Sequence, residues 1–229
     1  MARNVALSAV RSQVRAAADM TGSTFRTDAE INTMINASLA ELYDHVTESY
    51  DDQYASSASF TVVSGTATYS LATVAATFYK LIGLERLVSG TTYETLRRFT
   101  WSERNSRPTS SATGERYQYR VMGGNIHLIP VPANSTDSIR LWYVPTLTAL
   151  SADGDTFDGI NYWEEFVVAD VASKLLAMEE SDPSYWVARR KEQLARILSS
   201  APKRDVSEPD RISDVSVMGT SDLEWYPWR

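Results

Sequence analysis

The sequence contains no cysteine, which excludes disulfide bridges, cysteine-based zinc sites and a cysteine nucleophile. No apolar run approaches the roughly 18 residues that a membrane helix needs, and the first residues lack the continuous apolar block of a secretory signal. The absence of cysteine fits synthesis in a reducing cytoplasm.

Motifs of catalysis are also absent. The chain has two histidines, His45 and His127, and neither has an obvious partner nearby in sequence. No glycine-rich phosphate loop, nucleophile elbow or His-Glu zinc motif occurs. We therefore expect a protein that is not an enzyme, with no catalytic, cofactor-binding or metal-binding residues.

The stretch DGDTFDG, with Asp153, Asp155 and Asp158, resembles a calcium loop at first sight. A calcium loop of the EF-hand type places an oxygen ligand at its fifth position, where this stretch has Phe157. The stretch therefore predicts a turn that leads into a helix.

The charge of the chain is acidic and unevenly distributed. The net charge is −7, which disfavours sequence-specific binding to nucleic acid because phosphates are repelled. Residues 27–54 hold seven acids and no Lys or Arg, and residues 151–182 hold nine acids and one Lys. Residues 183–200 carry four basic residues and one Glu. Such blocks are either solvated helix faces or polar contacts between neighbouring subunits.

Two helices are predicted near the N-terminus. Residues 4–20 have apolar side chains at helical spacing and end at Gly22. Thr27-Asp28-Ala29-Glu30 is a capping-box pattern, which opens a long helix that runs to about Tyr54.

Two more helices are predicted towards the C-terminus. Residues 161–181 have a broad apolar face, and Asp170 and Lys174 are spaced to pair on it. Asp182-Pro183 is an N-cap followed by a proline that begins a helix to about Ser200. Because the first of these helices is acidic and the second basic, we expect a hairpin with matched charges.

Between these helices the pattern changes to the period of two that is typical of strands. The stretch YQYRVMGGNIHLIPVPANSTDSIRLWY, residues 117–143, predicts three adjacent antiparallel strands, the first two joined at Gly123-Gly124-Asn125. The other expected elements are a β-hairpin over 56–71, a strand or a short helix over 80–88, a strand over 93–99, a helical turn over 100–105 and a polar surface loop over 106–115.

These elements predict an α+β fold. We expect a helical bundle built from N-terminal and C-terminal helical hairpins, with an inserted antiparallel β-rich domain and an extended C-terminal tail. The predicted helical bundle domain consists of residues 1–55 and 160–201, the β-rich domain of 56–159, and the C-terminal extension of 202–229.

The C-terminal extension ends in the aromatic side chains Trp225, Tyr226 and Trp228. The polar composition before them is typical of a flexible tail. Large apolar groups in such a tail indicate either that it folds back on its own domain or that it orders on a partner.

This organisation resembles the head-to-tail adaptor, or connector, proteins of tailed bacteriophages. The resemblance is carried by the hairpin YRVMGGNIHLIPVP, the strand SIRLWYVPTLTAL and the helix opening NYWEEFVVADVASKLLAMEESDP. It implies a structural protein of the virion neck, made in the host cytoplasm, that forms a ring of commonly twelve copies without cofactor or membrane contact. The implied partners are the portal protein above, a tail or neck protein below, and DNA that passes through the ring without sequence-specific binding.

The resemblance also suggests two groups of site residues. The candidates for contact with the portal lie in the C-terminal extension and are Arg211, Ile212, Trp225, Tyr226 and Trp228. The candidates for the lining of the DNA channel are acids that repel phosphate, namely Glu41, Asp44, Glu48, Asp51 and Asp52.

Three alternatives remain at this stage. One is a tail-side completion protein that does not touch the portal. Another is a soluble β-sandwich module that binds a ligand between Trp142, Tyr117 and Tyr119. The third is an enzyme that depends on His45 or His127.

Overall fold

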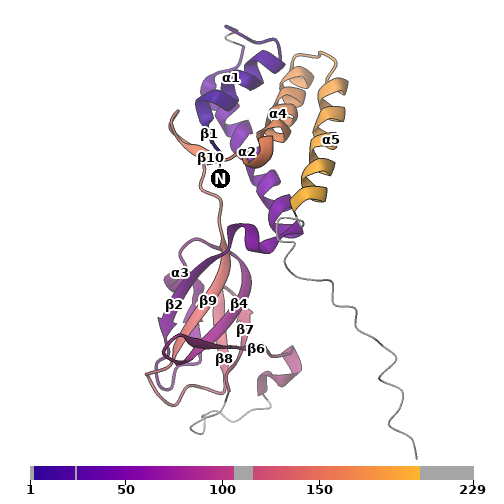
Figure 1. Cartoon of the computed structure of the whole chain (residues 1–229). Coiled ribbons are helices and arrows are strands. Elements are labelled where there is room, and N and C mark those ends of the chain that lie inside the picture. The colour runs from indigo at the N-terminus through magenta and orange to yellow at the C-terminus, as the bar shows by residue number, and fades with distance from the viewer. Residues whose placement is uncertain (1–2, 24, 106–115, 202–229) are drawn as a thin grey trace, which may run out of the picture.

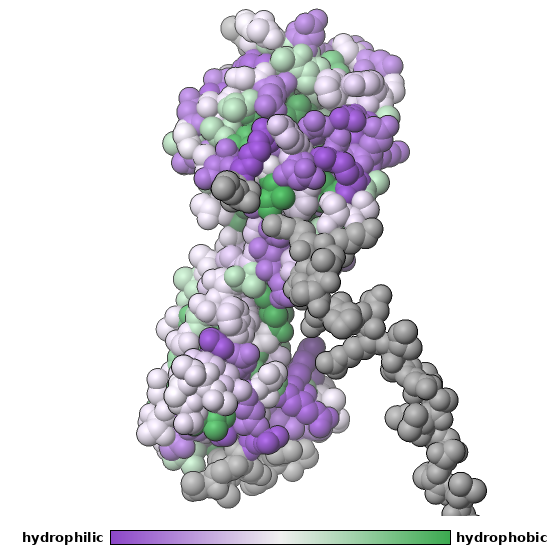
Figure 2. Space-filling model, viewed as in Figure 1, coloured by the Kyte–Doolittle hydropathy of each residue, from purple (hydrophilic) through white to green (hydrophobic). Residues whose placement is uncertain are grey.

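The computed structural model describes residues 3–23, 25–105 and 116–201. They form two lobes joined by a narrow waist, which the space-filling view makes plain (Figure 1, Figure 2). Each lobe has its own cluster of buried apolar side chains. We name them the helical lobe, which holds α1, α2, α4, α5, β1 and β10, and the β lobe, which holds β2 to β9 and α3.

The helical lobe is held together by one apolar face from each of its helices. Most of the buried side chains come from α1, α2 and α4, whereas α5 buries little more than Ile197. These helices confirm the four predicted from hydrophobic spacing, but the predicted end of the second near Tyr54 is wrong, because α2 ends at Ser49 and a 3₁₀ turn follows at Asp51–Tyr54. Their bounds are Leu7–Ala17 for α1, Asp28–Ser49 for α2, Glu164–Met178 for α4 and Ser184–Ser200 for α5.

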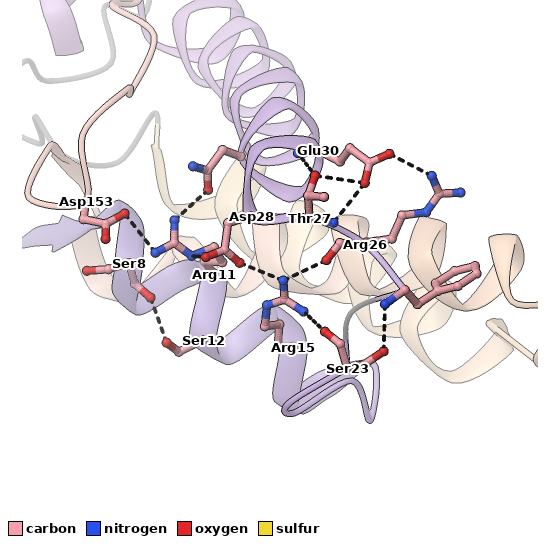
Figure 3. Close-up of polar contacts among 12 residues, drawn as sticks. Ser8, Arg11, Ser12, Arg15, Ser23, Arg26, Thr27, Asp28, Glu30 and Asp153 are labelled. Atoms are coloured by element: carbon pink, nitrogen blue, oxygen red, sulfur yellow. Dashed lines mark hydrogen bonds and ion pairs between the residues drawn. The ribbon is translucent and has the colours of Figure 1, made fainter.

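The predicted capping box at the start of α2 is confirmed. The Thr27 hydroxyl accepts a hydrogen bond from the Glu30 amide, and the Glu30 carboxylate accepts one from the Thr27 amide. That amide is the main reason why the pKa of Glu30 is lowered. Figure 3 shows Arg11 and Arg15 of α1 reaching Asp28 in the first turn of α2, with 2.7 Å between Arg15 Nη2 and Asp28 Oδ1. These contacts fix the α1–α2 turn.

The beginning of the first predicted helix is wrong. Residues Asn4–Ala6 form β1, which pairs antiparallel with β10 at Thr156–Asp158, and α1 starts only at Leu7. Beside this small sheet Arg3 forms an ion pair with the buried carboxylate of Glu164. Gly159 has no room for a side chain, since a Cβ there would lie 2.4 Å from Val5 Cγ2. The pairing joins segments about 150 residues apart, so it cannot be predicted from the local sequence pattern.

The β lobe consists of two four-stranded sheets that enclose the second apolar cluster. The strand order is β2-β9-β4-β5 in one sheet and β3-β8-β7-β6 in the other. The bounds are Ser56–Thr61 for β2, Thr68–Ser70 for β3, Phe78–Ser89 for β4, Thr92–Thr95 for β5, Arg97–Arg98 for β6, Gln118–Met122 for β7, Asn125–Ile129 for β8 and Ser138–Pro145 for β9, with the short α3 at Leu71–Val74.

The predicted strand pairings are confirmed only where the turn is tight. β7 and β8 form the expected hairpin, and Gly123 and Gly124 adopt the positive φ angles of 57° and 75° that its turn requires. The third strand of the predicted trio, β9, instead lies in the other sheet between β2 and β4. The hairpin predicted over 56–71 is also wrong, because β2 pairs with β9 and β3 pairs with β8.

The predicted architecture needs a correction at the level of the whole fold. The described residues form five α-helices and ten strands in three sheets, so a helical bundle that carries an inserted antiparallel β-rich domain is the wrong description. The helical lobe contains its own sheet, the β lobe contains α3, and β6 runs parallel to β7. The broader assignment to the α+β class holds. The predicted domain boundaries stay predictions.

Among the described residues, no helix combines the length and the apolar character required to cross a membrane.

Candidate functional site

A network of opposite charges joins α2, α4 and α5. At its centre lies Asp170 of α4, whose side chain is only 1 % exposed. Lys174 Nζ lies 2.5 Å from Asp170 Oδ2, which confirms the predicted pair, and Arg190 Nε of α5 lies 3.1 Å from Asp170 Oδ1. Arg190 also forms an ion pair with Glu41 of α2 and stacks over the Phe166 ring. A single arginine thus ties three helices together.

The hairpin of α4 and α5 has the matched charges that were predicted. Arg189 Nη2 lies 2.7 Å from Glu165 Oε2, and the side-chain amide of Gln193 donates to the same carboxylate. Asp182 accepts a hydrogen bond from the Ser184 amide in the turn between the helices. The predicted N-cap at Asp182 is wrong, because α5 begins at Ser184 and Pro183 occupies the N-cap position without a side-chain cap bond. These pairs lie within one chain, so these charges serve the fold of the helical lobe.

The five acids predicted to line a channel differ in their surroundings. Glu41 is half-buried in its pair with Arg190, and exposed Asp44 accepts a hydrogen bond from the Tyr79 hydroxyl at 2.8 Å. Glu48 and Asp52 are exposed and form no ion pair within the described part of the chain. For Asp51 the structure describes the backbone alone, at the start of a 3₁₀ turn. In this group of five, the acidic surface without ion pairs or side-chain hydrogen bonds among the described residues therefore consists of Glu48 at the end of α2 and Asp52 in the 3₁₀ turn that follows.

The junction between the lobes is held by hydrogen bonds from α2. The Tyr43 hydroxyl donates to the Pro145 carbonyl at 2.6 Å, and Lys80 Nζ donates to the Thr47 carbonyl at 3.2 Å. Tyr43 also stacks on Tyr54, with ring centroids 4.8 Å apart. An open, mainly apolar cavity of about 380 Å³ lies beside these rings; Leu39, Leu42, Leu147 and Phe157 contribute to its wall. Its composition suits packing and offers no set of converging catalytic groups.

The tyrosines of this junction predict a loss of stability at alkaline pH. Burial is the main cause that raises the pKa of Tyr43 to about 12, and the hydrogen bond to Asp44 raises that of Tyr79. A tyrosine in the unfolded chain ionises near pH 10. The stability that these neutral hydroxyls contribute is therefore complete below about pH 10 and is lost as the pH rises towards 12.

Urea unfolding at pH 9 and pH 11 checks this prediction. The free energy of unfolding should fall between the two pH values in the wild type, and it should fall less in Tyr43→Phe. An equal fall in both proteins would show that Tyr43 does not contribute to the pH dependence.

The two histidines lie apart in different lobes. His45 of α2 lies edge-on to Phe166 and 3.8 Å from Glu41 Oε1. His127 of β8 shares a hydrogen bond of 3.2 Å with the Thr68 hydroxyl. Among the described residues, neither ring bridges a hydroxyl and a carboxylate as the histidine of a catalytic triad does.

The aspartates of DGDTFDG are engaged by the protein itself. Asp153 forms an ion pair with Arg11, and Asp155 accepts hydrogen bonds from the Ser151 and Ala152 amides, which lower its pKa. Asp158 lies in β10. Within the residues that the structure covers, no group of three or more His, Cys, Asp or Glu side chains is arranged to hold a metal ion.

The proposed aromatic ligand groove is not formed. Tyr117 is 3 % exposed and Tyr119 is 8 % exposed, and both belong to the core of the β lobe. Trp142 donates its indole N–H to Glu85 at 3.0 Å. Buried rings cannot line an open groove, so two of the three candidate residues of the β-sandwich binding module are unavailable to a ligand, whereas Trp142 is half-buried.

Sequence reasoning missed a group of arginines in the β lobe. Arg97 and Arg98 form the edge strand β6, and Arg104 and Arg120 flank the exposed side chain of Trp101. A charge count for this segment alone would have pointed to them. We call these five residues the arginine patch. The predicted portal contacts, Arg211, Ile212, Trp225, Tyr226 and Trp228, lie outside the described residues.

Comparison with known proteins identifies one relationship. A family model described as SU10 adaptor protein matches residues 7–213, which include every element from α1 to α5. No protein in the curated set matches the chain.

Proposed function

Since the chain belongs to the SU10 adaptor protein family, we propose that it joins the portal of a phage capsid to the tail as a ring that continues the DNA channel. Membership by itself makes the chain a phage adaptor and a structural component of the virion. The place of the ring in the neck, its twelve copies and its contact with the portal are parts of the proposal.

The family match over α1 to α5 is the observation that carries the proposal. The structure supports it in two ways. Exposed Glu48 in the last turn of α2 and exposed Asp52 in the 3₁₀ turn that follows suit a surface past which DNA slides without binding, because like charges repel. The absence of an assembled catalytic group among the described residues is compatible with a role in assembly, and we propose that the chain has no enzymatic activity.

Mass measurement of the purified chain, alone and mixed with the portal protein, tests the proposal. We expect a monomer that becomes a stoichiometric ring only on the portal. A ring that forms on a tail protein without the portal would instead assign the chain to tail-side completion. A chain that stays monomeric with both partners would contradict the adaptor ring.

Charge reversal at the acidic surface tests the channel. In the double variant Glu48→Lys/Asp52→Lys, lysines facing the channel would bind the phosphates electrostatically, and DNA release from virions triggered in vitro should slow about tenfold or more. The rate is measured with a DNA-binding dye. Glu179→Lys/Glu180→Lys makes the same change in charge at the exposed turn after α4 and should leave the rate unchanged. Equal rates in wild type and the first variant, or a ring structure with Glu48 and Asp52 on its outer surface, would rule out this lining.

A further inference from the structure

The arginine patch contains the described arginines of the β lobe that have no carboxylate partner among the described residues. Within the described part of the chain, Arg97, Arg98, Arg104 and Arg120 form no ion pair with a carboxylate. Other arginines of the lobe do, since Arg86 and Arg116 contact Glu94 and Arg140 contacts Glu85. The patch therefore carries positive charge that no carboxylate among the described residues neutralises.

The distribution of charge along the chain strengthens this observation. Residues 56–150 contain nine Lys and Arg against five Asp and Glu, a net charge of +4. The whole chain carries −7, so the remaining residues carry −11. The β lobe is thus a basic body attached to an acidic one, and Figure 2 shows hydrophilic residues gathered along its lower right edge, where Figure 1 places β6.

Trp101 lies at the centre of the patch. Its side chain is 56 % exposed, and the guanidinium carbons of Arg104 and Arg120 lie 4.5 Å and 5.6 Å from its ring centroid. Backbone carbonyls hold both arginines in place, since Arg104 donates to Trp101 and Arg120 donates to Phe99. These two arginines are accordingly held in place before any partner binds, which lowers the entropy cost of binding through them.

The chemistry of the patch favours a protein partner that presents carboxylates. Guanidinium groups bind carboxylates through two parallel hydrogen bonds, and Trp and Arg are the side chains most often found at the energetic centres of protein interfaces. DNA is a poorer fit for two reasons. The Trp101 ring is already stacked by two guanidinium groups, which leaves its faces less available to a base. The charge of −11 on the rest of the chain also repels phosphates at longer range.

We propose that the arginine patch docks a carboxylate-bearing surface of the protein on the tail side of the ring. The proposal rests on the proposed adaptor function, in which residues 202–229 serve the portal. The portal-contact candidates follow α5 in the chain, and α5 belongs to the helical lobe, whereas the arginine patch belongs to the β lobe (Figure 1). We therefore assign the patch to the other neighbour of the ring.

The test uses a phage that lacks its own copy of the gene and is complemented by the full chain or its variants. Particles are purified by density gradient, and their proteins are quantified by mass spectrometry. With Arg97→Glu/Arg98→Glu we expect particles that contain the adaptor but whose tail proteins fall about tenfold or more, the equivalent of about 1.4 kcal/mol in binding. Lys191→Glu, an exposed cation on α5 without an ion pair among the described residues, should give normal particles.

Further outcomes separate the alternatives. Suppressor mutations that replace Asp or Glu by Lys or Arg in a tail protein would support the proposed complementarity. Normal particles from the double variant would overturn it, as would particles without adaptor, which would place the patch between copies or at the portal. If the wild-type chain bound a 20-base-pair DNA duplex in fluorescence anisotropy and Arg97→Glu/Arg98→Glu did not, the patch would be assigned to DNA. If even the wild-type chain is missing from particles, the adaptor function itself fails.

Discussion

Removal of residues 220–229 is expected to leave a folded monomer that no longer binds the portal protein. This segment contains Trp225, Tyr226 and Trp228, and it follows the last described element, α5. Aromatic side chains at the centre of an interface commonly contribute about 2 kcal/mol or more each. The loss of three such groups should abolish binding at micromolar concentrations, as measured by isothermal titration calorimetry with purified portal protein.

Matched variants separate the aromatic rings from the rest of the extension. Trp225→Ala/Tyr226→Ala/Trp228→Ala in the full chain should reproduce the effect of the deletion. Ser207→Ala/Ser213→Ala/Ser216→Ala in the same extension should bind like the wild type, and Arg211→Ala/Ile212→Ala reports on the two remaining candidates. Unchanged portal affinity after the deletion would contradict the anchor, and loss of the circular dichroism signal of folded helices would show instead that the segment supports the fold.

Replacement of Arg190 by methionine is expected to destabilise the helical lobe by about 3 kcal/mol. The substitution keeps an apolar stem of similar length but leaves Asp170, only 1 % exposed, with Lys174 as its remaining cation. Breaking one side of a buried ion pair typically costs about 3–5 kcal/mol. We place the effect at the lower end because Lys174 stays in contact. The measurement is the free energy of unfolding in urea, followed by far-ultraviolet circular dichroism.

The neighbouring arginine provides the control. Arg189 pairs with Glu165, whose side chain is 43 % exposed, so Arg189→Met should cost about 1 kcal/mol or less. Asp170→Leu/Arg190→Met removes both partners of the buried pair and should recover most of the stability lost in Arg190→Met. Equal effects of Arg190→Met and Arg189→Met would show that the buried network adds nothing beyond a surface pair.

The elements predicted correctly from the sequence are those whose signals lie within a few residues. The Thr27–Glu30 capping box, the Asp170–Lys174 pair and the glycines of the β7–β8 turn each satisfy a backbone or charge requirement locally. Hydrophobic spacing located the four main helices for the same reason, since one apolar face per helix must be buried wherever the helix packs. The resemblance to phage adaptors was also readable at this level, and the family match bears it out.

The errors concern partners that are distant in sequence. Strand β9 has the alternating pattern of any half-buried strand, and this pattern does not say whether β8 or β2 and β4 will lie beside it. For the same reason the residues of strand β1 were predicted as the start of a helix, because their pairing partner β10 is about 150 residues away in sequence. The error in the overall architecture follows from these missed pairings.

The functional residues also divide into those that the sequence could identify and those that only the tertiary structure could. Composition and periodicity alone determined that the chain is acidic, free of cysteine, α+β in class and provided with an aromatic C-terminal segment. Only the tertiary structure decided that Glu41 pairs with Arg190 and that Tyr117 and Tyr119 are core residues. It also decided that four arginines of the β lobe have no carboxylate partner in the described part of the chain. The reason is that a local pattern tells how each segment satisfies its own backbone and buries one face. Which charges remain available to a partner depends on the long-range packing that brings the segments together.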